Sequence, residues 1–242
     1  MKEGLHITAV WQNGGFSAKL NGSSSIELLC KTEDLCFEFR HFAKLQNVSG
    51  NAKKNEMEEK ISKIKYHYEN KKYCKILRKF AKNSRGETSG FIVDYSENFI
   101  IIQESNEFDI LGYFVFPIST IEEIRYNNSD KYYEKILKEE KLIEKVGLKH
   151  KIELKNWQTI FESIKDCGLN VIIENENPED ETFDIGPITK ITGKSVFINY
   201  FDAKGFLDDE ETEIDWDKIT LVKFDDRYVN IFSKYLRKRK QK

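Results

Sequence analysis

The sequence predicts a mainly β protein with helices: two tandem five-stranded units, each with flanking helices, and a β-rich N-terminal segment. The strongest observation is an internal repeat, because Gly90 and Asp130 recur as Gly186 and Asp226 in similar local sequences. Both pairs have the same offset of 96 positions, which indicates two copies of one folding unit. The second observation is that short apolar runs alternate with turn residues in both copies, as is typical of strands.

The composition indicates a folded protein that does not enter a membrane. Of the 242 residues, 39% are hydrophobic and 33% are charged, and the 17 Phe and 11 Tyr can build compact cores. The net charge of −2 does not favour a general nucleic-acid binder. No apolar run has the length of a membrane span, and the first residues lack a signal-peptide core. We therefore expect a cytoplasmic protein with reduced cysteines and no membrane contact.

Residues 1–52 are expected to form a β-rich appendage. Asn13-Gly14 supplies the positive φ angles of a tight hairpin turn between two of its strands. A polar stretch at 46–56 follows and is interpreted as a linker. The strands of the appendage are predicted at 6–11, 16–20, 26–30 and 35–39.

The first repeat is assigned to residues 57–150. A helix is expected at 57–68, because Ile61 and Ile64 lie on one helical face. A second helix is expected at 131–146. Five strands are predicted between these helices, the first ending near residue 80 and the others at 90–94, 99–103, 113–118 and 121–126.

The second repeat is assigned to residues 151–242. Asn156 is expected to cap a helix whose apolar residues recur at i, i+3, i+4 and i+7 from Trp157. Gly168 is expected to end that helix in the left-handed conformation. A last helix is predicted at 227–239. Five strands are predicted between these helices, at 169–174, 183–191, 195–200, 213–216 and 219–224.

In both repeats the last predicted strand is followed by an Asp and, two residues later, by a Tyr. We expect Asp130 and Asp226 to begin the helices that follow, because Asp is favoured at the N-cap. We expect Tyr132 and Tyr228 to seat those helices on the strands.

One sequence motif and the order of elements together suggest a known family. Gly90 is followed by apolar residues, a polar turn that contains Asn98, and an apolar strand from Phe99 onward. This motif, within one short helix and five strongly bent strands, resembles the Sm/LSm family. Its members are small open barrels that usually form rings around RNA, so the resemblance, over about residues 70–240, implies two Sm-like barrels. The segments Gly90–Ser96 and Ile198–Gly205 also resemble segments of uncharacterised bacterial proteins.

The family's second motif ends in Arg-Gly, which shapes the pocket where an RNA base stacks. In this chain Tyr126 follows Arg125, and Phe224 follows Lys223. A large side chain therefore replaces the glycine where backbone room is needed. The resemblance implies RNA contacts only at Arg125 and Lys223.

Two charged segments are further candidate binding sites. The first is a basic C-terminal segment made of Arg237, Lys238, Arg239 and Lys240. It either contacts phosphates or is a solvated helix end whose cations face the helix dipole. The second is an acidic loop made of Asp208, Asp209, Glu210 and Glu211. It suits a basic protein partner and lacks the ligand spacing of a calcium loop.

Neither a metal site nor catalysis is expected. Cys30, Cys36 and His41 do not have the spacing of zinc ligands. No phosphate-binding Gly loop or nucleophile motif occurs, and the four His residues are scattered along the chain. We therefore expect no cofactor and no enzymatic activity.

The leading hypothesis is a non-enzymatic binding or adaptor protein. Open barrels leave strand edges that can pair with a protein partner or with a second copy of the chain. Two alternatives remain. One is RNA binding, which the Sm-like resemblance implies, and the other is immunity-type inhibition of a basic toxin through the acidic loop.

Overall fold

The computed structural model describes residues 7–12, 15–20 and 55–239, with side chains described from residue 55 onward. The internal contacts divide the chain into two compact units, residues 1–59 and residues 60–242. The two units are described separately below.

The first unit contains an antiparallel pair of strands. β1 (Ile7–Gln12) pairs with β2 (Gly15–Leu20), with Ile7 opposite Leu20 and Gln12 opposite Gly15. These strands lie where the sequence predicts the first hairpin. The strands predicted at 26–30 and 35–39 lie outside the described residues.

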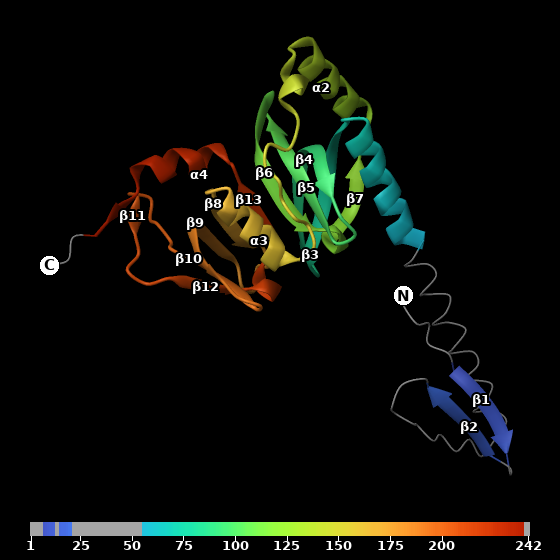
Figure 1. Ribbon diagram of the computed structural model, residues 1–242. Coiled ribbons are helices and arrows are strands. Elements are labelled where there is room, and N and C mark those ends of the chain that lie inside the picture. The colour runs from blue at the N-terminus through green and yellow to red at the C-terminus, as the bar shows by residue number, and fades with distance from the viewer. Residues whose placement is uncertain (1–6, 13–14, 21–54, 240–242) are drawn as a thin grey trace. The chain divides into compact units, whose positions relative to one another are not determined.

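The second unit is built on one ten-stranded antiparallel sheet, as far as the described residues show (Figure 1). The order of its strands is β12-β10-β9-β8-β13-β6-β5-β4-β3-β7. Within the part of the chain that the structure describes, the strands pair as an open sheet and no pairing closes either half into a barrel. The bounds are β3 (Tyr73–Ala81), β4 (Ser84–Tyr95), β5 (Phe99–Asn106), β6 (Asp109–Pro117), β7 (Ile121–Arg125), β8 (Asn170–Asn175), β9 (Thr182–Ile191), β10 (Ser195–Ile198), β12 (Thr212–Asp215) and β13 (Leu221–Phe224).

The two halves of this sheet have the same internal order. In the first half the last strand, β7, pairs with the first strand, β3, and β4, β5 and β6 follow outward. In the second half the last strand, β13, pairs with β8, and β9, β10 and β12 follow. The halves join where β13 pairs antiparallel with β6, with Val222 opposite Val115 and Phe224 opposite Tyr113. One continuous sheet therefore contains both copies.

A close approach between strands explains the glycine that begins each repeat. A Cβ atom on Gly90 would lie 2.0 Å from the carbonyl oxygen of Gln103, and one on Gly186 would lie 2.2 Å from that of Asn199. Gln103 and Asn199 are themselves 96 positions apart in the sequence. The repeat in the sequence therefore marks one steric requirement that both copies share.

Helices precede and follow each set of strands. A helix at residues 55–69 precedes β3, and α2 (Asn128–Glu139) follows β7. α3 (Trp157–Asp166) precedes β8, and α4 (Arg227–Phe232) follows β13. Short 3-10 helices connect other elements: η1 (Ile118–Thr120), η2 (Leu142–Lys145), η3 (Trp216–Lys218) and η4 (Ser233–Tyr235).

α3 confirms the helix predicted from the apolar periodicity. Asn156 caps it by accepting a hydrogen bond from the Thr159 N–H at 2.9 Å. The side chains at i, i+3, i+4 and i+7 from Trp157 are all buried. Gly168 follows in the left-handed conformation, with φ of +68°, as a C′ glycine does.

The predicted last helix is too long. α4 ends at Phe232, and after η4 the chain becomes a short strand, β14 (Arg237–Lys238). β14 pairs in parallel with β11 (Phe206–Leu207) as a separate two-stranded sheet. The partner strand β11 pairs with the extended backbone of this segment. Residues 237–239 therefore do not form the helix end expected from the sequence.

The prediction for Asp226 is confirmed, whereas the predictions for Asp130 and for the two Tyr residues are not. Asp226 is the N-cap of α4, whereas Asp130 lies at the third position of α2 and completes a capping box with Asn127. Tyr132 is 64% exposed and Tyr228 is 51% exposed. Neither tyrosine is therefore buried between its helix and the strands, and that prediction is wrong.

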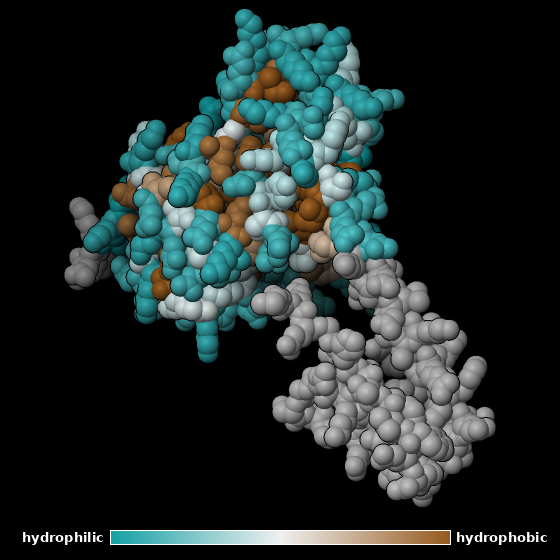
Figure 2. All heavy atoms as spheres, turned by 45° about the vertical axis from the view of Figure 1, so that its right-hand side comes forward, coloured by the Kyte–Doolittle hydropathy of each residue, from teal (hydrophilic) through white to brown (hydrophobic). Residues whose placement is uncertain are grey.

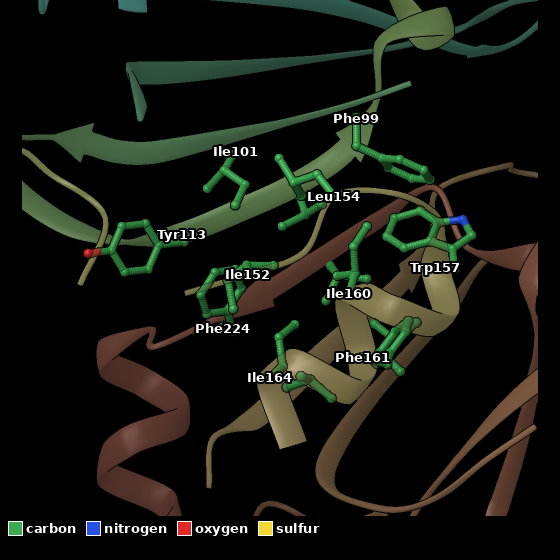
Figure 3. Packing of buried hydrophobic residues seen from close by; sticks show 14 of the residues in the cluster. Phe99, Ile101, Tyr113, Ile152, Leu154, Trp157, Ile160, Phe161, Ile164 and Phe224 are labelled. Atoms are coloured by element: carbon green, nitrogen blue, oxygen red, sulfur yellow. The ribbon is translucent and has the colours of Figure 1, made fainter. Parts of the chain in front are cut away.

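The largest hydrophobic cluster draws side chains from both halves. Across the β6–β13 junction, the rings of Tyr113 and Phe224 stack with centroids 5.1 Å apart. The ring centres of Phe99 in the first half and Trp157 in α3 lie 4.7 Å apart (Figure 3). These side chains are buried together, so the two halves share the largest of three hydrophobic clusters among the described residues.

The surface of the described residues is mostly hydrophilic on the face drawn in Figure 2, with apolar side chains gathered near its centre. No helix among the described residues is long and apolar enough to cross a membrane.

Candidate functional site

Arg125 in β7 and Lys223 in β13 lie at equivalent positions of the two halves, but both cations already have partners. Arg125 Nε lies 3.3 Å from a carboxylate oxygen of Asp130. Lys223 Nζ lies 2.6 Å from Glu174 and 4.9 Å from the ring centre of Phe114. The structure does not bring Arg125 and Lys223 together, because four strands separate β7 from β13 in the sheet. Neither residue presents a bare cation to a phosphate.

A polar pocket of about 300 Å³ lies beside Arg125. Two cations in its wall share one carboxylate: Glu87 lies 3.0 Å from Lys75 and 3.7 Å from Arg125. Burial raises the pKa of Tyr73, also in the wall, to about 12, so its hydroxyl stays protonated. The pocket therefore offers hydroxyl groups and balanced charges rather than an excess of positive charge.

A second pocket, of about 280 Å³, lies between the two halves and is lined by aromatic rings. Phe99 comes from β5, Trp157 begins α3, and Trp216 begins η3. Figure 3 shows the rings of Phe99 and Trp157 side by side. At its rim, a Cβ on Gly193 would meet nothing within 4 Å. This aromatic pocket has room for a planar apolar group. No local sequence pattern marks this pocket, because its residues are far apart in the chain.

A buried ion pair joins the two halves, between a residue of β3 and the residue that follows β8. The guanidinium of Arg78, only 3% exposed, donates to both carboxylate oxygens of Glu176 at 2.6 and 2.8 Å. Arg78 also donates to the Thr88 hydroxyl and lies 4.8 Å from the ring centre of Phe116. The Thr220 hydroxyl donates to Glu176 at 2.9 Å. All these partners are internal, so the pair fixes the two halves and is not a free binding group.

Glu134 organises a second buried cluster under α2. Its carboxylate accepts hydrogen bonds from the Tyr73 N–H, the Tyr126 hydroxyl, Lys72 and Lys138. Burial raises the pKa of Glu134, but these hydrogen bonds outweigh burial and its pKa lies below the usual value. The charged carboxylate therefore ties the beginning of β3 to α2.

The basic C-terminal segment and the acidic loop meet each other. Arg239 lies 3.2 Å from Asp208, and Arg237 packs on Phe206 of β11 with its guanidinium 4.1 Å from the ring centre. Lys238 is exposed within β14. The remaining acids of the loop, Asp209, Glu210 and Glu211, are exposed, and Lys240 lies outside the described residues.

The described residues contain no cluster of three or more His, Cys, Asp or Glu side chains that could hold a metal ion. Cys30, Cys36 and His41 lie outside those residues. Of the other cysteines, Cys74 is buried, which raises the pKa of its thiol, and Cys167 is exposed.

No protein-family model, curated protein or solved structure with which the chain was compared matches it.

Proposed function

We propose that the chain is a non-enzymatic binding or adaptor protein made of two tandem Sm-like modules, which binds through the edges of its sheet. Two observations support the Sm-like assignment: each half has one helix followed by five strands of the ten-stranded sheet, and each half begins its repeat with a glycine at a close strand approach. The observation that carries the proposal is the β6–β13 junction, where one module pairs with the next.

The junction indicates which edges are complementary. β7 occupies in the first half the position that β13 occupies in the second, and β12 corresponds in the same way to β6. In the described sheet β7 and β12 each have a neighbour on one side only. Antiparallel pairing of β7 with β12 of another molecule would repeat the internal junction, and such a head-to-tail contact forms rings or filaments.

Proline substitutions on β7 test this proposal. Glu123 and Ile124 pair with β3 in regular register, opposite Leu77 and Ile76. Consecutive N–H groups there point to opposite sides, so of Glu123→Pro and Ile124→Pro one removes an N–H directed to β3 and the other, the outward variant, removes an N–H directed to the open edge. We expect wild type to increase in mass with concentration by light scattering. We expect the outward variant to weaken association at least about tenfold without unfolding. A wild-type monomer at every concentration would overturn edge self-association.

RNA binding is the second candidate, and the aromatic pocket is the observation that favours it. An RNA base stacks on aromatic rings without sequence preference, and the pocket brings Trp157 and Trp216 together at a single site. Quenching of tryptophan fluorescence by single-stranded RNA, lost in Trp216→Ala, would support this function. Purified full-length protein that neither carries nucleic acid nor shows quenching would exclude it.

A further inference from the structure

The C-terminal segment occupies a defined place on the second half of the chain. Phe206 of β11 lies opposite Arg237 of β14, and Leu207 lies opposite Lys238. The Arg237 N–H donates to the Gly205 carbonyl oxygen at 2.9 Å. An extended segment is thus held by its backbone along β11.

The side chain of Arg237 is recognised by its shape as well as by its charge. Its Nε and Nη2 donate to the Lys204 carbonyl oxygen at 3.2 and 2.9 Å, while its plane packs against Phe206. A lysine ammonium has neither the planar fork nor the flat face that these contacts require. This position therefore favours arginine.

A second arginine, two residues later, reaches two carboxylates. Arg239 Nη2 lies 3.2 Å from Asp208 and 3.6 Å from Asp202. The N–H groups of Lys204 and Phe206 donate to Asp202, and these hydrogen bonds lower the pKa of its carboxyl. Asp202 is therefore charged and oriented by its own loop.

Gly205 allows the segment to approach. Its φ is +75°, and a Cβ there would lie 2.9 Å from the Tyr235 carbonyl oxygen. A side chain at this position would be strained and would push the C-terminal segment away. The loop is thus shaped to admit a backbone beside it.

We infer that this surface, the arginine site formed by Asp202, Lys204, Phe206 and Asp208, is a docking site for an extended segment of a basic protein partner with arginines at alternate positions. The chain's own C-terminal segment shows the chemistry of the occupant and occupies the site in its absence. This inference rests on the proposed binding role. It involves β11 and not the sheet edges, so it is tested independently of edge pairing.

The contacts of the cis segment are suited to displacement. β14 has two residues, both exposed, and the Arg239 side chain is 51% exposed. Exposed ion pairs contribute little to stability. Asp209, Glu210 and Glu211 stay exposed next to the arginine site, so a longer basic segment from a partner gains contacts that the chain's own segment does not make.

A labelled peptide with the sequence of residues 234–242 tests the inference by fluorescence anisotropy. In full-length R237A/R239A the arginine site is vacated, so we expect the peptide to bind at least about tenfold more tightly than to wild type, where the cis segment competes at high effective concentration. Equal binding to the two proteins, or no binding to either, would overturn the inference. Should the double variant fail to fold by circular dichroism, a chain that ends at Leu236 lacks β14 altogether and serves in its place.

Two controls separate specific docking from general charge attraction. Adding D202N/D208N to R237A/R239A should abolish the gain in peptide binding. A peptide with lysine in place of both arginines keeps the charge and should bind at least about tenfold more weakly. Equal binding of the lysine peptide contradicts the inference. Single-stranded RNA that binds wild type but not R237A/R239A would instead show the segment itself to be the binding element, and would overturn it.

Discussion

At the scale of single residues, the two copies have diverged at one buried amide. In the first copy, Gln103 donates to the carbonyl oxygens of Leu111 and Lys145 and accepts from the Gly147 N–H. In the second copy, the corresponding Asn199 Oδ1 is buried without a hydrogen-bond partner, alone among the described side chains. One copy therefore uses this amide to hold a connecting segment, and the other does not.

This difference predicts unequal costs for the same substitution. Gln103→Leu leaves the Gly147 N–H without its acceptor and should lower the free energy of unfolding by about 2–3 kcal/mol. Asn199→Leu removes an amide oxygen that already lacks a partner and should change it by less than about 1 kcal/mol. Urea denaturation of both variants measures the two values, and equal losses would contradict the assignment.

A buried histidine makes the stability depend on pH. Burial lowers the pKa of His67 below 6.5, although hydrogen bonds to backbone atoms of Lys72 and Tyr73 oppose this. As pH falls below about 6.5 the unfolded chain binds a proton that the folded chain resists, so stability falls by at most about 1.4 kcal/mol per pH unit. His67→Gln should flatten this part of the curve. An unchanged slope, from urea denaturation between neutral and acidic pH, would be evidence against this role.

At the scale of elements, the strands of the ten-stranded sheet and α3 could be predicted from sequence because their signals are local. Asn156, the apolar periodicity and Gly168 define α3 within a few neighbouring residues. The end of the last helix could not be predicted, because residues 237–239 form an extended segment only through contact with β11, about 30 positions earlier. β11 itself has two residues and no periodicity to detect.

The glycine at the close strand approach gives a prediction for one element. Gly90→Ala places a Cβ against the Gln103 carbonyl oxygen at a φ of +156°, and should lower the free energy of unfolding by about 3 kcal/mol or more. Gly193→Ala is the matched control, because its Cβ would meet open space. Thermal denaturation compares the two, and a neutral Gly90→Ala would show that the approach relaxes.

At the scale of the whole molecule, the repeat could be predicted but the joining of its copies could not. The offset between Gly90 and Gly186 is visible in the sequence, whereas the β6–β13 pairing depends on residues about 100 positions apart. The same limit applies to the candidate sites. Arg125 and Lys223 could be identified as cations, but their partners Asp130 and Glu174 emerge only from the folded chain.

The ion pair between the halves gives a prediction for the whole molecule. Arg78→Met leaves Glu176 charged, largely buried and without its cationic partner, and should lower the free energy of unfolding by about 3–5 kcal/mol. The double variant R78M/E176Q should lose less than the two single variants added together. Arg85→Met breaks an exposed ion pair with Glu122 and is the control, with little expected change. Additive losses in the double variant would contradict the coupling.

The stacked rings of Tyr113 and Phe224 make the exposed surface of each copy depend on the presence of the other. A chain whose second copy had been deleted would expose the unpaired side of β6 and the ring of Tyr113 to water. Such a remnant would precipitate or recruit another strand. The two joined modules can therefore accept different surface substitutions, but neither module can be deleted without exposing the strand edge of the other.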